Sequence, residues 1–405
     1  MQMKVLFTFG GLPHYLIALL NRINVLPGVE VVVIVPSGDR KTIGQGVQQT
    51  DKGMNFKVIY VEEFKTWYGK PFYKELRNIL LKEKPDILVT IWPFILGFVF
   101  YPFLYLFMKR NSVKLIMKDI PFNVPKINKA FSYYKKHPVY DEYLKKEKNT
   151  GTSFYIKTTF ITILRKIYYN LIDATVNYTD EGKEIISSYG LHPDKIFATY
   201  NSPDTDLLYK AKEDIKSEQK FLPENKHRII HIGRLVPWKR TDLLIRAFAN
   251  IQKKYPDAEL IIIGNGPQEK ELQELISSLH IIDSVKCIGG IYDNKMLGHY
   301  LTESTIYVLA GMGGLSINEA MIFGKPIICS VCDGTEKKLV RDGYNGLYFK
   351  EADQNSIEEK IDYLFSNPEE IKRMGENSEK IIRDEVNIHT VVNGYMKAFN
   401  FVLSK

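Results

Sequence analysis

The sequence is poor in cysteine and lacks the marks of several protein classes. Its 405 residues include 3 cysteines, which are too few for a framework of disulfide bridges and fit a reducing compartment. The residues from Met1 to Val5 run directly into a strand pattern, without the apolar core and small-residue cleavage site of a signal peptide. Low-complexity tracts and short-period repeats are also missing. We therefore expect a cytoplasmic globular protein rather than a secreted, fibrous or disordered one.

The composition allows two sizeable buried cores. Hydrophobic residues make up 45% of the chain, charged residues 25% and aromatic residues 12%, which are ordinary values for globular proteins. The length predicts two domains, or at most three. The formal net charge is 55 − 47 = +8, so the chain is mildly basic.

Most of this positive charge is concentrated in one segment. Residues 126–170 contain ten lysines and arginines against three acidic residues, a net charge of 10 − 3 = +7, together with ten phenylalanines and tyrosines. Upstream, residues 87–108 form a run of 22 residues without a charge that contains eight aromatic residues. Because Pro93, Gly97 and Pro102 interrupt this run, it is marginal for a membrane span.

An exposed aromatic helix beside a basic segment is typical of a peripheral membrane contact. Aromatic rings sit well at the headgroup level, and lysines bind anionic lipid. We therefore expect residues 92–108 and 126–170 to contact an anionic membrane surface, at its inner face. A helix buried under the first domain is the alternative for the apolar run. Nucleic acid is the competing interpretation of basic and aromatic residues, but we do not expect it as a partner because the strand-end motifs below already suit a nucleotide-sized ligand.

Apolar strand patterns alternate with amphipathic helical patterns along the chain. In the first half the strands are predicted over 4–9, 30–36, 58–61, 86–91, 114–118, 174–179 and 195–200, with helices over 16–23, 72–84 and 180–189. After a polar stretch over 210–226, strands are predicted over 228–233, 259–264, 285–289, 306–310 and 326–330, with helices over 239–255 and 268–279. Continuous apolar strands between amphipathic helices indicate parallel sheets covered on both faces. The fold class is therefore α/β, in two halves of similar size.

Gly233-Arg234 closes the first strand of the second half, and Lys239 opens the following helix. Strand ends of a parallel sheet face a crevice toward which helix N-termini point, so this place suits an anion. An arginine and a lysine five residues apart can grip a diphosphate from two sides. A solvated basic start of a helix is the alternative interpretation.

A second motif runs from Gly311 to Met321, between the strand over 306–310 and a helix. Its three glycines let backbone N–H groups approach a ligand closely, and the helix dipole adds positive potential. Glu319 lies about one turn into that helix, where a carboxylate can hydrogen-bond a ribose diol. An acid in the first turn also stabilises a helix, but the glycine-rich turn favours the binding role.

Four other patterns carry less information. Gly264 and Gly266 lie in a strand-to-helix turn of ordinary composition, and the loop over 333–336 is as well explained as a surface turn. Asp204 and Asp206 have the spacing of a metal-binding pair but lie in a loop between the halves. Cys329-Ser330-Val331-Cys332 is a lone CxxC without a second pair for zinc. We predict no metal site.

Together these spacings resemble the second half of the retaining glycosyltransferases of family 4, the glycosyl transferases group 1. The resemblance covers about 120 residues, with the segments in the family's order. The matching segments are GRLVPWKR (233–240), LIIIGNGP (260–267), NEAMIFGKPII (318–328) and GTEKKLVRDGYNGLYF (334–349). The first half resembles the family weakly, through Gly10-Gly11 after the first strand.

The resemblance implies the GT-B fold, in which two Rossmann-like domains face a central crevice. It places an acceptor-side domain over 1–202 and a nucleotide-sugar-binding domain over 203–387, with the last helix, 388–405, crossing back onto the first domain.

The resemblance also implies a set of site residues. Arg234 and Lys239 bind the donor diphosphate and Glu319 the ribose, and these three are the residues predicted to carry catalysis. The glycine-loop amides bind the transferred sugar, and Ile291 flanks the base. The donor-binding residues predicted in this way are Gly10, Gly11, Gly233, Gly264, Gly266, Ile291, Gly311, Met312, Gly313, Gly314, Leu315 and Ser316.

The chain departs from the family in two places. The first of two glutamates separated by seven residues falls at Gly311, which has no side chain to contact a sugar hydroxyl. The family often carries a histidine after the strand matched by 114–117, where this chain has Lys118-Asp119. We take Lys118, Asp119 and His14 as candidate acceptor-side groups, although a histidine at the start of a helix is often structural.

By resemblance, the chain is a hexosyltransferase that moves a sugar from a UDP- or GDP-linked donor to a glycan or lipid-linked acceptor in cell-surface polysaccharide synthesis, with retention and without metal or other cofactor. Two alternatives remain open. The missing glutamate and histidine also suit a nucleotide-sugar-binding subunit without catalysis of its own. A sugar-nucleotide epimerase shares the two-lobed architecture, but it needs an acid and a base that Glu319 alone does not supply.

Overall fold

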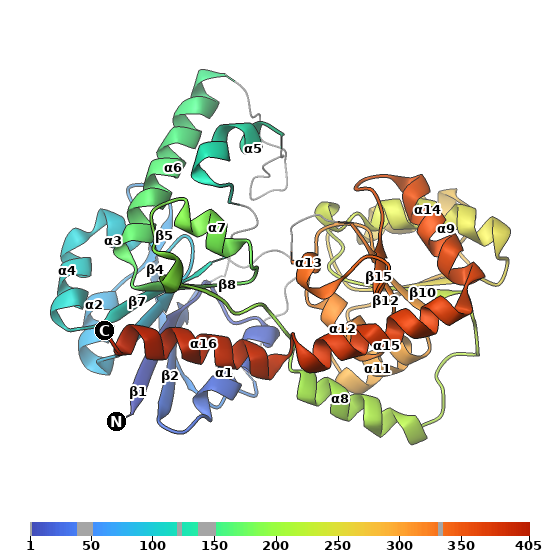
Figure 1. Ribbon diagram of the computed structural model, residues 1–405, viewed down its shortest axis with the longest axis horizontal. Helices are drawn as coiled ribbons and strands as arrows, with labels where there is room; N and C mark the ends of the chain where they lie inside the picture. The colour runs from blue at the N-terminus through green and yellow to red at the C-terminus, as the bar shows by residue number, and fades with distance from the viewer. Residues whose placement is uncertain (1, 39–51, 120–123, 137–150, 331–334) are drawn as a thin grey trace. The chain divides into compact units, whose positions relative to one another are not determined.

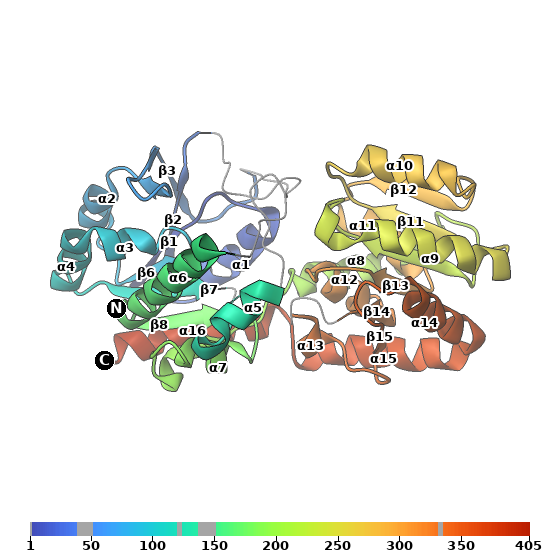
Figure 2. The same cartoon turned by 90° about the horizontal axis from the view of Figure 1, so that it is seen from above.

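The chain folds into two α/β units in the computed structural model, which describes residues 2–38, 52–119, 124–136, 151–330 and 335–405. The first unit extends to Tyr200 and includes His389–Lys405, and the second unit is Asn201–Ile388. Figures 1 and 2 show helices on both faces of each central sheet.

The first unit is built on a parallel sheet of seven strands within its described residues. Its strands are β1 (Met3–Thr8), β2 (Val29–Pro36), β3 (Lys57–Val61), β6 (Ile87–Thr90), β7 (Lys114–Asp119), β8 (Ala174–Asn177) and β9 (Ile196–Ala198), in the order β3-β2-β1-β6-β7-β8-β9. In the central strand β1, Val5 aligns with Val31 on one side and Ile87 on the other. Strands β1, β2, β6, β7 and β8 are largely buried on both faces, which is why they read as nearly continuous apolar runs.

Helices and one small hairpin cover this sheet. The helices are α1 (His14–Asn24), α2 (Leu76–Glu83), α3 (Leu96–Phe100), α4 (Pro102–Arg110), α5 (Ala130–Lys136), α6 (Thr152–Leu171), α7 (Gly182–Ser187) and α16 (Ile388–Leu403). The antiparallel hairpin pairs β4 (Glu63–Lys65) with β5 (Pro71–Tyr73). A helix predicted over 72–84 therefore starts late, because residues 71–73 pair with β4 instead of joining the helix.

The second unit contains a parallel sheet of six strands among the residues that the structure describes. Its strands are β10 (Arg228–Ile232), β11 (Glu259–Ile263), β12 (Val285–Gly289), β13 (Ile306–Leu309), β14 (Ile327–Cys329) and β15 (Gly346–Tyr348), in the order β12-β11-β10-β13-β14-β15. Its helices are α8 (Thr205–Asp214), α9 (Thr241–Lys254), α10 (Glu269–Ser278), α11 (Asn294–Thr302), α12 (Ser316–Ile322), α13 (Glu336–Leu339), α14 (Gln354–Ser366) and α15 (Pro368–Asp384).

Two helical layers enclose this second sheet. Helices α9, α10 and α14 pack on one another on one face, and α8, α11, α12 and α15 on the other (Figure 1). The predicted apolar stripe of α9 is confirmed, with Leu244, Ala247, Phe248 and Ile251 buried against the sheet. The stretch over 210–226, which reads as merely polar, begins inside α8.

Each sheet has one place where the strand order reverses. In the second unit the first strand, β10, lies between β11 and β13, and in the first unit β1 lies between β2 and β6. Ligands of such doubly wound sheets bind outside the carboxyl ends of the strands at this topological switch point. The loops after β10 and β13, and those after β1 and β6, are therefore the places where a site is expected.

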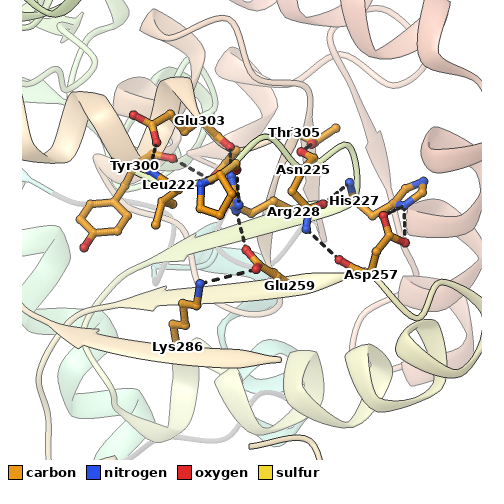
Figure 3. A network of polar contacts seen from close by, with 12 residues as sticks. Leu222, Asn225, His227, Arg228, Asp257, Glu259, Lys286, Tyr300, Glu303 and Thr305 are labelled. Atoms are coloured by element: carbon orange, nitrogen blue, oxygen red, sulfur yellow. Dashed lines mark hydrogen bonds and ion pairs between the residues drawn. The ribbon is translucent and has the colours of Figure 1, made fainter. Parts of the chain in front are cut away.

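A buried arginine fastens the opposite, amino end of the second sheet (Figure 3). Arg228, which is 1% exposed, donates from Nε to Glu259 Oε2 at 2.8 Å, from one terminal nitrogen to the Glu303 carbonyl at 2.7 Å and from the other to the Pro223 carbonyl at 2.8 Å. The Glu303 carboxylate in turn accepts the backbone N–H groups of Phe221 and Leu222. This network ties the segment before β10 to the sheet.

Candidate functional site

Lys239 lies at the switch point of the second sheet, in the single turn Pro237–Lys239 that follows β10. Its side chain is buried, and Nζ donates hydrogen bonds to the backbone carbonyls of Met312 at 2.7 Å and Gly313 at 2.6 Å. The ammonium is thus held against the glycine loop that follows β13. The two predicted motifs, which are more than 70 residues apart in the sequence, meet at this amine.

Arg234 lies in the loop between β10 and this turn and is half-buried. Its guanidinium carbon is 5.6 Å from the centroid of the Trp238 ring, a cation–π contact with the residue that precedes Lys239. A planar guanidinium and a buried ammonium, both in the segment between β10 and α9, are groups that can bind a diphosphate.

Gly311 owes its identity to a close approach of two backbones. The N–H of Met312 donates to the Trp238 carbonyl at 2.9 Å, which brings the loop against the turn that carries Lys239. A Cβ at position 311 would lie 2.2 Å from the Trp238 oxygen and 2.6 Å from the carbonyl carbon of Lys239. This arrangement leaves no room for the side chain that the family pattern has here.

Gly264 and Gly266 are also glycines because two backbones approach each other closely. A Cβ on Gly264 would lie 1.8 Å from the Gly233 oxygen, and one on Gly266 would lie 2.2 Å from the Leu235 oxygen. Two backbone bonds close this contact, from Gly233 N to Ile263 O at 2.9 Å and from Leu235 N to Asn265 O at 3.0 Å. These glycines let the loops after β10 and β11 pack together, whereas Gly233 itself has room for a methyl group.

Glu319 lies in the first turn of α12, as the sequence predicts. Its side chain is only partly exposed, and desolvation by the surrounding protein raises the pKa of the carboxyl to about 7. Ser316, at the start of the same helix, accepts a hydrogen bond from the Tyr307 hydroxyl at 2.8 Å, so its hydroxyl helps to fix α12 to β13. Ile291 is half-buried just after β12.

His231 is a site-side residue that the sequence analysis did not single out. It is buried in β10, with Nδ1 2.9 Å from the Val308 carbonyl and Nε2 3.4 Å from the Thr241 hydroxyl. Burial, with a smaller contribution from the nearby Lys239 ammonium, lowers the pKa of His231 to about 4. The imidazole is therefore neutral at pH 7 and ties β10 to β13 and α9. The sequence could have pointed to His231, because it is a lone histidine inside an apolar strand.

The predicted residues of the first unit lie at the carboxyl ends of its own strands. Gly10 and Gly11 are buried after β1, and His14 is the exposed first residue of α1. Lys118 and Asp119 are the buried last residues of β7.

Aromatic side chains surround these last two residues. The Lys118 ammonium lies 4.3 Å from the centroid of the Tyr178 ring and donates to its hydroxyl, and burial lowers the pKa of Lys118 to about 8. Asp119 accepts a hydrogen bond from the Tyr169 hydroxyl. A lysine with this pKa is mostly charged at neutral pH.

The weaker patterns have structural explanations where they are described. Asp204 caps α8, with its carboxylate accepting from Leu207 N at 3.4 Å. Cys329 is a buried residue of β14, whereas Cys332 and residues 333 and 334 lie outside the described residues. Within the described part of the chain, no group of three or more histidine, cysteine or acidic side chains is arranged to hold a metal ion.

The aromatic run over 92–108 divides between core and surface. Phe94 and Phe98 are buried in the first core, whereas Phe103 is 85% exposed on α4. Between α2 and α4, aromatic rings and the side chains of Arg77 and Arg110 line a groove of about 860 Å³. Among the described residues, none of the helices has the length and apolarity that a membrane crossing requires.

Comparison with known proteins identifies the second unit. Residues 212–381 match the family described as Glycosyl transferases group 1. This match lies within the second unit and covers less than half of the chain. The group 1 segment contains Arg234, Lys239, the glycine loop and Glu319, whereas the first-unit residues lie outside it.

Curated relatives match about half of the chain. An uncharacterized glycosyltransferase of Haemophilus influenzae is 33% identical over 190 residues, which are 44% of this chain and 52% of that protein. The alpha-monoglucosyldiacylglycerol synthase of Acholeplasma laidlawii is 28% identical over 234 residues, which are 56% of this chain and 54% of that protein. The chain thus spans about half the length of these curated relatives.

Solved structures show the fold. The sucrose-phosphate synthase from Thermosynechococcus elongatus superposes with a TM-score of 0.70 at 15% identity, over 100% of both chains. The expected GT-B fold, with two Rossmann-like units, is confirmed.

Proposed function

We propose that this chain is a retaining glycosyltransferase that takes a sugar from a UDP- or GDP-linked donor. The observation that carries the proposal is the contact between Lys239 and the glycine loop at the switch point of the second sheet. This contact holds a buried ammonium against the backbone of the glycine loop, and the Arg234 guanidinium lies on the ring of Trp238, which is next to Lys239 in the sequence. A nucleoside diphosphate has the charge and length to meet all three.

The reaction follows from where charge develops. When the bond between the anomeric carbon and the β-phosphate oxygen breaks, negative charge grows on the departing diphosphate. Lys239 and Arg234, already fixed by the loop carbonyls and by the Trp238 ring, stabilise that charge without having to reorganise. Because this interaction is stronger in the transition state than in the bound donor, it lowers the barrier.

Retention calls for attack on the face that the diphosphate leaves, since no protein carboxylate in the described site is placed as a nucleophile. In this step the acceptor oxygen bonds to the anomeric carbon while its proton passes to the departing phosphate oxygen. The resulting glycoside keeps the anomeric configuration of the donor. Nuclear magnetic resonance of the product anomer tests this directly.

Gly311 bears on the donor sugar. Because the family's first glutamate is absent, a sugar hydroxyl at this place meets backbone groups of the loop instead of a carboxylate. Such a site favours a donor sugar that does not rely on a carboxylate contact at that hydroxyl.

The acceptor is proposed to be a glycan or a lipid-linked sugar. The Acholeplasma relative is named for a glycolipid product, which supports a lipid-linked acceptor. Lys118, Asp119 and His14, at strand ends of the first unit, are the residues proposed to meet it.

Replacement of Lys239 tests the proposal. Lys239→Ala removes the ammonium from the developing diphosphate charge, and we expect the transfer rate to fall at least about a hundredfold, the order expected for one preorganised charge. The measurement is release of the nucleoside diphosphate from a panel of UDP- and GDP-sugars with glycan and lipid-linked acceptors.

Lys325→Ala is the matched control. Lys325 Nζ also donates to two carbonyls, those of Thr302 at 3.1 Å and Ser304 at 2.6 Å, but at the other end of α12. A similar loss of thermal stability in both variants with loss of transfer only in Lys239→Ala supports the proposal. Near-normal turnover by Lys239→Ala would overturn it. Donor binding without any turnover would indicate the non-catalytic subunit, and a new sugar epimer without acceptor would indicate the epimerase.

A further inference from the structure

Helix α6 of the first unit has an exposed apolar face. Ile156 is 66% exposed, Phe160 55%, Ile163 52% and Ile167 42%. At about 100° per residue these four positions fall within about 60° around the helix axis, so they form one stripe. Figures 1 and 2 show α6 standing out from the sheet with α5 beside it.

This stripe is separate from the core-facing side of the helix. Phe154, Leu164, Tyr168 and Tyr169 are buried on the other side of α6, where they pack against the first unit. A surface helix normally shows one apolar face. The second apolar face of α6 is therefore available for a partner.

The surroundings of the stripe are positively charged. Within the described residues 124–136 and 151–171 there are seven lysines and arginines and no aspartate or glutamate. Two of them have partners in the fold, since Lys126 pairs with Glu184 and Arg165 donates to the Tyr134 hydroxyl. The side chains of five lysines in these ranges are exposed, namely Lys129, Lys135, Lys136, Lys157 and Lys166.

The lysines of α6 are placed beside the apolar stripe. At about 100° per residue, Lys157 falls on one side of it and Lys166 on the other. Lysine stems in this position lie along an apolar surface while the ammonium groups reach outward. An apolar stripe with a lysine at each edge is the pattern of a helix that lies in the plane of a membrane interface.

We propose that this face of α6 binds an anionic lipid membrane. The net positive charge repels a second copy of the same face, which disfavours a dimer seam. Nucleic acid would pair with the lysines but gains nothing from three exposed isoleucines, whereas a lipid surface receives both. The stripe lies within 126–170, the second of the two segments that the sequence analysis expects at a membrane, whereas Phe94 and Phe98 of the first segment belong to the core. This inference stands apart from the proposed transferase activity.

Vesicle binding by the full chain tests the proposal. The probe is a sedimentation assay with vesicles of phosphatidylcholine containing roughly one third phosphatidylglycerol, and with pure phosphatidylcholine vesicles. We expect binding to the anionic vesicles that weakens as salt is raised. Ile156→Ser/Phe160→Ser should lower the partition coefficient at least about tenfold, and Lys157→Glu/Lys166→Glu should do the same at low salt.

Matched controls remove equivalent groups from the second unit. Leu207 and Ile282 are exposed to 50% and 63%, so Leu207→Ser/Ile282→Ser removes two comparable apolar side chains. Lys253→Glu/Lys372→Glu reverses two exposed lysines. Both controls should bind vesicles as the original chain does, and thermal unfolding checks that every variant is folded.

Three outcomes would overturn the proposal. The first is no binding to anionic vesicles at low salt, and the second is equal binding by the α6 variants and their controls. The third is a different partner in the absence of vesicle binding. This partner would be either a second copy, seen as a dimer in analytical ultracentrifugation that Ile156→Ser/Phe160→Ser dissociates, or single-stranded RNA that binds tightly.

Discussion

At the scale of single residues, Gly311 shows how tightly two loops of the second unit are packed. We predict that Gly311→Ala lowers the free energy of unfolding by at least about 1–3 kcal/mol, because its Cβ meets the Trp238 and Lys239 backbones. Chemical denaturation measures this. Gly311→Glu should not create the family's sugar contact, since the larger side chain disturbs the loop further.

Gly38→Ala is the control, because no atom of the described residues lies within 4 Å of a Cβ at that position. It should change stability by less than about 0.5 kcal/mol. If Gly311→Ala is as stable as Gly38→Ala and Gly311→Glu raises the transfer rate, the loop is not packed as described.

The ionisation of Glu319 gives a second prediction at this scale. Burial raises the pKa of this carboxyl to about 7, so the folded state holds a proton that the unfolded state releases near pH 4.5. Stability from this group is present below pH 4.5 and is lost as the pH rises to about 7. Glu319→Gln should remove this slope from the pH dependence of thermal unfolding.

Ligand binding should show the opposite trend. A ribose diol donates hydrogen bonds, and the charged carboxylate accepts them better than the protonated acid. Between pH 6 and pH 8, the affinity of the original chain for a nucleoside diphosphate should therefore rise about tenfold more than the affinity of Glu319→Gln. Calorimetry measures both affinities. Equal pH profiles would show that Glu319 does not meet the ribose.

Arg234, Lys239 and Glu319 could be proposed from the sequence because each follows a strand at a recognisable spacing. It did not show why Gly264 and Gly266 are glycines, because the facing carbonyls of Gly233 and Leu235 come from another loop. His231 was missed for the same reason, since its partners at Val308 and Thr241 lie on β13 and α9.

At the scale of elements, the Arg228 network holds the segment before β10 to the second sheet (Figure 3). We predict that Arg228→Met destabilises the protein by about 3–5 kcal/mol, because it leaves a carboxylate and two carbonyls without their buried donor. Lys270→Met is the comparison, since its ion pair with Glu274 is largely exposed and should contribute less than about 1 kcal/mol. Equal losses in the two variants would contradict the role given to the network.

The strands were easier to predict than the helices. Buried parallel strands such as β2 and β11 are continuous apolar runs, which few other elements imitate. The start of α2 was misplaced because the pairing of 71–73 with β4 depends on a neighbouring strand. Helix α6 was not predicted as a helix, since its exposed apolar face blurs the usual contrast between two sides.

At the scale of the whole molecule, α16 belongs to the first unit although it follows the second in the chain. Phe399 is fully buried and lies 6.3 Å from Phe7 of β1, ring centroid to ring centroid. We predict that Phe399→Ala lowers the stability of the first unit by about 3–5 kcal/mol and leaves the second unit nearly unchanged. Scanning calorimetry with and without a nucleoside diphosphate separates the two units, because the ligand should raise only the melting temperature of the second unit.

Phe103→Ala is the control for this variant. Phe103 belongs to the same unit but is 85% exposed, so its removal should have little effect. A shift of both transitions by Phe399→Ala would mean that the units unfold as one.

The path of the chain also sets the order in which the protein is completed during translation. Residues 201–388 emerge from the ribosome as one uninterrupted stretch and can fold as soon as the last of them is out. The sheet begun by β1 waits for α16, so its apolar underside stays open to water and to chaperones until some two hundred further residues have been synthesised. The half that is made first is therefore the half that is finished last.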